Sequence, residues 1–127
     1  MPLTESGRNA IASAIIADSF TSFDNANAHL GAGDSNTAFA ASQTDLQASL
    51  NKLRRGMEAG YPQRMNNELS FQALFGTDDA NWEWTEWGLF NADSAGVMLT
   101  RKVDALGTKT NAQSWLLTAT LTVEIGS

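Results

Sequence analysis

The run from Trp115 to Ile125 alternates apolar side chains with mostly polar ones, and it is the longest period-2 pattern in the chain. Successive side chains of a β-strand point to opposite faces, so this run predicts a strand with an aliphatic face toward a core and a threonine-rich face toward solvent. Shorter alternating runs at 28–32, 69–75 and 97–103 predict further strands. The 127 residues are enough for one hydrophobic core, so we expect a single β-rich domain over residues 1–127.

The tryptophan-rich part of the chain changes parity partway along. In a regular strand Trp82 and Trp84 share one face, whereas Trp87 and Leu89 lie on the other. One extra residue near Thr85-Glu86, a β-bulge, would turn all four toward the core. The expected core residues are Trp82, Trp84, Trp87, Phe71, Phe75, Trp115, Leu117 and Leu121.

Two segments predict helices. Thr4 is placed to cap a helix that runs to about Asp18, with Ile11, Ile15 and Ile16 on one narrow face. Because that face is narrow, the helix is expected to pack against a larger element.

A second helix is predicted from Ser42 or Thr44, because apolar residues then recur with helical spacing and Tyr61-Pro62 would end the helix. The apolar stripe comprises Leu46, Leu50, Leu53 and Met57. The predicted fold class is therefore mainly β with two short helices, as an antiparallel β-sandwich or a compact barrel.

The charge balance limits the classes of partner. The formal net charge is −6, which repels phosphate backbones, so we expect no nucleic-acid partner. The one basic cluster, Lys52, Arg54, Arg55 and Arg64, reads as a solvated helix face or an inter-subunit patch of salt bridges. No stretch approaches the ~20 apolar residues of a membrane-spanning helix, and no signal peptide is expected. We therefore expect no membrane partner.

The chain offers little for catalysis or metal binding. It has no cysteine and a single histidine, His29, with no serine nucleophile in a strained turn to accompany it. We expect no enzyme activity, no catalytic residues, no cofactor and no metal site. A loose Ca²⁺ site formed by Asp78, Asp79 and Asp93 is the less favoured alternative.

Glu83 and Glu86 stand among Trp82, Trp84 and Trp87, a grouping that also occurs in sugar-binding grooves. Polar residues between tryptophans are equally expected where the tryptophans build a core, because neighbouring strand residues face opposite ways. The core interpretation is favoured, and a carbohydrate-binding module remains as an alternative function.

Several short segments carry a family resemblance: Trp87–Ala92, Gly96, Met98-Leu99, Arg101-Lys102, Leu106–Thr110 and the strand Trp115–Ile125, together with Met1–Asn9 and Leu30–Asp34. With these segments the chain resembles small structural proteins in the virions of tailed bacteriophages, of the head-decoration, tail-fibre or minor tail type. The resemblance touches most of the chain. It implies a virion protein made in the host cytoplasm.

Within that resemblance we expect a capsid decoration or cement subunit, because the chain ends at Ser127 directly after its last predicted strand. The alternative is a tail or tail-fibre attachment subunit. The expected partners are further copies of the chain in a homo-oligomer, and the major capsid protein or the tail and fibre proteins.

Four residues are candidates for assembly contacts. Phe20 and Phe23 lie in an N-terminal segment of mostly small and polar residues, where neither ring has an obvious partner of similar size within the chain. Arg54 and Arg55 belong to the basic cluster. Aromatic residues at oligomer contacts contribute strongly when a partner buries them. The alternative is that both phenylalanines join the core.

Overall fold

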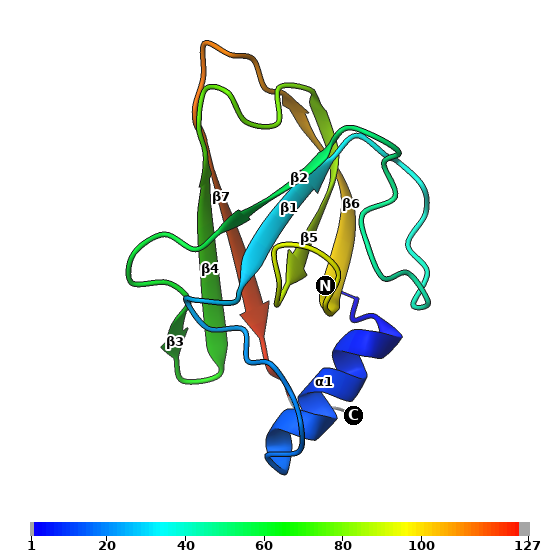
Figure 1. Cartoon of the computed structure of the whole chain (residues 1–127), viewed down its shortest axis with the longest axis vertical. Helices are drawn as coiled ribbons and strands as arrows, with labels where there is room; N and C mark the ends of the chain where they lie inside the picture. The colour runs from blue at the N-terminus through cyan, green and yellow to red at the C-terminus, as the bar shows by residue number, and fades with distance from the viewer. Residues whose placement is uncertain (1, 125–127) are drawn as a thin grey trace.

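A computed structural model describes residues 2–124 and contains two antiparallel sheets with one short helix (Figure 1). The first sheet has the order β2-β1-β5-β6, formed by Lys52–Gly56, His29–Gly33, Glu83–Phe90 and Met98–Thr108. The second has the order β3-β4-β7, formed by Gln63–Met65, Glu68–Phe75 and Trp115–Thr122. The expectation of a mainly β chain is confirmed, and within residues 2–124 the two sheets are not closed into a barrel.

The predicted β-bulge is present in β5. The pairing of β5 with β6 shifts register between Trp84 and Glu86, next to Thr85. The shift allows Trp84 and Trp87, three positions apart, both to be buried.

The hydrophobic core takes side chains from both sheets. Trp84 of β5 packs edge-on against Phe75 of β4 and Trp115 of β7, with ring centroids 4.8 and 5.0 Å apart. Among the predicted core residues, Phe71, Phe75, Trp84 and Trp87 are buried. The others, Trp82, Trp115, Leu117 and Leu121, are only partly buried and pack against the core from its margin.

The second predicted helix is wrong. Within the described residues, 34–51 form a loop without helical turns, and 52–56 form β2, which pairs with β1. Leu46 is buried, but Leu50 is 89% exposed, so the stripe does not share a face. Pairing with β1 and the anchoring of the loop described below outweigh the local helical spacing.

The helix α1, Glu5–Ile15, begins as predicted, because the Thr4 hydroxyl accepts a hydrogen bond of 2.8 Å from the Gly7 amide. It ends at Ile15 rather than near Asp18, since Ala17 has a left-handed backbone (φ 54°). A Cβ atom at Gly7 would lie 2.4 Å from the carbonyl oxygen of Leu99, so glycine permits close packing of α1 on β6. No helix among the described residues has both the length and the apolar character needed to span a bilayer.

Candidate interface

An apolar groove lies between α1 and the end of the second sheet. Its volume is about 240 Å³, and its floor is formed by the buried residues Phe71 and Leu99. Its walls come from α1, from the segment after it, and from β4 and β7 with the residue that follows β7. The wall residues are Ala10, Ile11, Ala14, Phe20, Thr21, Ser22, Phe23, Leu69, Leu121 and Val123.

The groove is bordered by exposed aliphatic and aromatic side chains. Phe20 is 45% exposed and Val123 64%. Ile15 lies one helical turn after Ile11 on the same side of α1, and Ile15 and Ile16 are each at least three-quarters exposed. We call the groove, together with Ile15 beside it on α1, the α1 groove.

The structure brings two of the four interface candidates to this place. Phe20 and Phe23 both line the α1 groove, where Phe23 packs against the core and Phe20 remains partly open to solvent. The alternative was that both phenylalanines join the core. Phe23 does pack against it, whereas Phe20 does not. The exposure of Ile15 and Ile16 could not be read from the sequence, because it depends on what covers α1.

Arg54 and Arg55 lie elsewhere, on β2, and both are engaged within the chain. The Arg54 guanidinium stacks on the Phe90 ring at 3.6 Å from the centroid. It donates hydrogen bonds to the carbonyls of Ala92 and Ala95, at 2.9 and 3.0 Å, and pairs with Asp45. Because its side chain is 9% exposed, Arg54 anchors the 92–95 loop instead of presenting a charge to solvent.

The remaining charges of the basic cluster near β2 are also paired. Arg55 forms a two-pronged ion pair with Asp79, and its hydrogen bond lowers the pKa of that carboxyl below the ordinary value of 3.8. Lys52 pairs with Asp45 at 3.0 Å. Partial burial acts to raise the pKa of Asp45, but hydrogen bonds from Lys52 and Arg54 outweigh it and lower the pKa.

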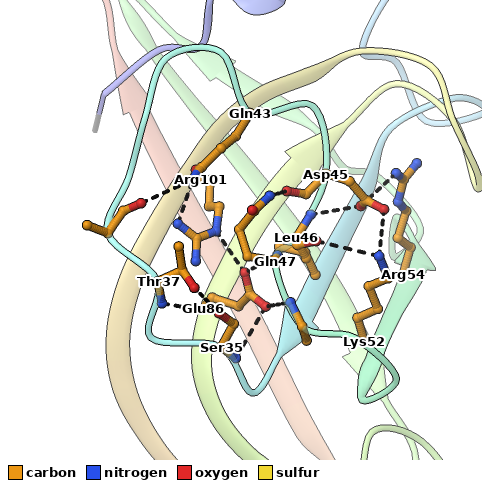
Figure 2. A network of polar contacts seen from close by, with 12 residues as sticks. Ser35, Thr37, Gln43, Asp45, Leu46, Gln47, Lys52, Arg54, Glu86 and Arg101 are labelled. Atoms are coloured by element: carbon orange, nitrogen blue, oxygen red, sulfur yellow. Dashed lines mark hydrogen bonds and ion pairs between the residues drawn. The ribbon is translucent and has the colours of Figure 1, made fainter.

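A buried polar network connects the loop 34–51 to the first sheet (Figure 2). Glu86 accepts hydrogen bonds from Arg101 Nε at 2.7 Å and from the amides of Gln47 and Ala48, each at 2.8 Å. The Ser35 amide adds a longer bond of 3.3 Å. Both charged side chains are fully buried, and both carboxylate oxygens of Glu86 accept hydrogen bonds from loop amides, so Glu86 holds the loop in place.

His29 and Asp79 are also held by local contacts. His29 Nδ1 lies 2.8 Å from the carbonyl oxygen of Asn27, and Asp79 accepts a hydrogen bond from the Gly76 amide. Across residues 2–124 no group of three or more histidine or carboxylate side chains gathers in an arrangement that could hold a metal ion.

Two of the three clustered tryptophans lie inside the fold, and the third, Trp82, is partly buried. Trp84 and Trp87 are 1% and 7% exposed, so they do not present ring faces to a ligand. Glu86, which would supply one of the paired carboxylates of a sugar site, is bound to Arg101 in the interior. These positions do not favour the carbohydrate-binding alternative.

Comparison of the chain with models of protein families gives no match, and comparison with curated proteins gives none either.

Proposed function

We propose that this chain is a structural subunit of a tailed-bacteriophage virion, a capsid decoration or cement protein that attaches to the assembled particle through protein–protein contacts. The two sheets, which share one core, are interpreted as a β-sandwich that carries the attachment surface. The family resemblance supports a location in the virion, and the α1 groove supports a surface for attachment.

The α1 groove is the observation that carries an assembly role. Large apolar side chains that are mostly exposed and lie together are uncommon on monomeric proteins and mark interaction surfaces. Here the partly exposed Ile11, Phe20 and Val123 line a cavity that reaches the core at Phe71, and the exposed Ile15 lies one helical turn after Ile11. An apolar side chain from a protein of the particle would fill this cavity, while the exposed rim would be covered around it.

A non-enzymatic role is supported by how the reactive side chains are used. Glu86 is committed to Arg101 and to backbone amides, and His29 is held against Asn27. These contacts stabilise the fold, and they engage the Glu86 carboxylate and the Nδ1 atom of His29.

The experiment uses virions that lack the protein and purified chain added back to them. Electron microscopy of the reconstituted particles is expected to show added density on the head lattice. Density confined to the tail would replace the decoration role with the tail-attachment alternative, and absence of binding to any part of the particle would overturn the virion proposal.

The same assay tests the α1 groove. The variant Ile15→Ser with Phe20→Ser removes exposed apolar surface and leaves the buried core residues in place, so it should fold and bind at least about tenfold more weakly. The matched control is Leu50→Ser, because Leu50 is exposed but belongs to the loop 34–51. Equal attachment by the double variant and the control would remove the groove from the contact.

A further inference from the structure

The edge strand β7 lacks the features by which β-sheet proteins prevent pairing between molecules. In the described residues β7 pairs with β4 alone, so its other side carries unpaired backbone groups (Figure 1). From Trp115 to Val123 there is no charged residue, proline or glycine. Its pairing with β4 runs without a register shift over all eight residues. A regular, uncharged edge of this length is a template for another strand.

The other edge strands of the two sheets carry features that prevent pairing with a second molecule. β2 carries Lys52, Arg54 and Arg55, and β3 has only three residues, including Arg64. β6 carries Lys102 and Asp104 and is covered by the N-terminal segment, where Leu3 bridges to Thr100. Charges, shortness and covering segments are the usual means of blocking an edge. Within the part of the chain that the structure describes, β7 has none of them.

The central part of β7 has a palindromic sequence. The five residues from Leu117 to Leu121, Leu-Thr-Ala-Thr-Leu, read the same in both directions around Ala119. A twofold axis at Ala119 would therefore set Leu117 opposite Leu121 of a second copy, and Thr118 opposite Thr120. Leucine would meet leucine on the inner face and threonine would meet threonine on the outer face, which are favourable cross-strand pairs.

The exposure of the strand fits such a partner. Leu117 and Leu121 are only half-buried, because no strand among residues 2–124 lies beyond β7 in the sheet, and Thr118 and Thr120 are exposed. The same axis would set Trp115 opposite Val123 of the second copy, and both of these side chains are accessible as well. Apolar surface at the margin of the core would thus be covered on both molecules.

We infer that two copies of this chain associate through antiparallel pairing of their β7 strands about a twofold axis at Ala119, which joins the second sheets into one continuous sheet. Because β7 carries no charge, it cannot form ion pairs with a charged edge strand of another protein. A second copy of β7 instead offers leucine opposite leucine and threonine opposite threonine. The contact spans only Trp115–Val123 of each chain, including the exposed Leu116 and Val123, so we expect an interface that is small beside the roughly 1,200–2,000 Å² that stable interfaces bury. The dimer is therefore reversible and depends on concentration.

This inference deepens the proposed assembly role, but its test needs only the purified chain in solution. Sedimentation of the parent at concentrations up to about 1 mM is expected to show a monomer–dimer equilibrium. The variant Thr118→Lys with Thr120→Lys puts like charges opposite each other across the axis and should raise the dissociation constant about tenfold or more. An equal mixture of this variant with Thr118→Glu and Thr120→Glu should restore a dimer containing one chain of each kind.

The matched control is Val103→Lys with Ala105→Lys, two exposed positions with the same spacing on the edge strand β6, which should leave the dimer unchanged. Circular dichroism and melting of every variant check the fold. A parent that stays monomeric up to about 1 mM overturns the inference. So does a lysine variant that dimerises like the parent, or a lysine–glutamate mixture that stays monomeric.

If the lysine variant does not fold, hydrogen exchange of the parent decides the question. Amides of β7 should become more protected as the concentration rises through the dimerisation range, and unchanged protection overturns the inference. A monomeric chain that still attaches to virions would reject the dimer while leaving the proposed function intact.

Discussion

Arg101 and Glu86 form an ion pair in which both side chains are fully buried, with Arg101 Nε 2.7 Å from Glu86 Oε1. The pair joins β6 to β5, and through the amides of Gln47 and Ala48 it holds the loop 34–51 on the first sheet (Figure 2). The loop has no regular structure of its own, so its position depends on this carboxylate.

Replacing Glu86 by glutamine should lower the free energy of unfolding by about 3–5 kcal/mol, because it leaves the Arg101 charge buried without a counter-charge. Urea unfolding measures the change. The double variant Glu86→Leu with Arg101→Met should lose less than the sum of its two single variants, since it leaves no unpaired charge. A loss below about 1 kcal/mol for Glu86→Gln would contradict the structural role.

The same substitution should also release the loop locally. Chymotrypsin is expected to cut Glu86→Gln faster than the parent after Phe39 or Leu50, because cleavage requires the loop to leave the sheet. Cleavage that begins in the strands would instead indicate global unfolding.

Gly33→Ala should destabilise the fold by about 1–3 kcal/mol through overpacking. A Cβ atom at Gly33 would lie 2.4 Å from Glu86 Oε2 and 2.9 Å from its Cδ, so the buried carboxylate would have to move. Gly56→Ala is the matched control, because the nearest side-chain atom to a Cβ there is 3.7 Å away. Thermal melting of the two variants should differ clearly, and similar melting would show that Glu86 can relax.

Trp84→Ala should cost about 3–5 kcal/mol, since Trp84 is buried between Phe75 and Trp115 and its indole N–H donates to Ala80. Trp115→Ala should cost less, because Trp115 lies at the edge of the sheet and is only partly buried. Chemical denaturation ranks the two. A larger loss of unfolding free energy for Trp115→Ala would mean that the exposed side of Trp115 is covered in solution, as the β7 dimer requires. The difference between the two variants should then depend on protein concentration.

Stability should fall in acid as Asp79 is protonated. Its pKa is lowered in the folded protein, so its contribution is complete above the ordinary value of 3.8 and is lost as the pH falls through the folded pKa. Asp79→Asn should therefore melt below the parent at pH 7, and the two should converge toward pH 2. A difference that persists unchanged at low pH would assign the loss to the cap on the Gly76 amide instead of the pair with Arg55.

Local patterns predicted much of the fold. The alternation in 28–32, 69–75, 97–103 and from Trp115 onward corresponds to β1, β4, β6 and β7, and the parity change among the tryptophans marks a real bulge. Ile125 lies outside the described residues. These predictions succeed because the side-chain period of a strand is a property of the backbone itself.

The failures come from residues whose role depends on partners far away in the chain. Leu46 and Leu50 have helical spacing, yet Glu86, about forty positions later, binds the amides between them and keeps the segment extended. The sequence indicated that Arg54 is a solvated surface charge. In the fold its guanidinium stacks on the Phe90 ring and donates hydrogen bonds to the carbonyls of Ala92 and Ala95, which are about forty positions away in the chain.

The sequence by itself determined where most strands alternate, where α1 begins and where the bulge in β5 lies, because each follows from neighbours within a few residues. The tertiary structure alone decided that Ile15, Ile16 and Phe20 stay exposed and that Lys52, Arg54 and Arg55 form ion pairs within the chain. It also decided that β7 is a sheet edge among the described residues. Exposure and edge position depend on which elements pack beside a residue, and that is set by the order of strands in the two sheets.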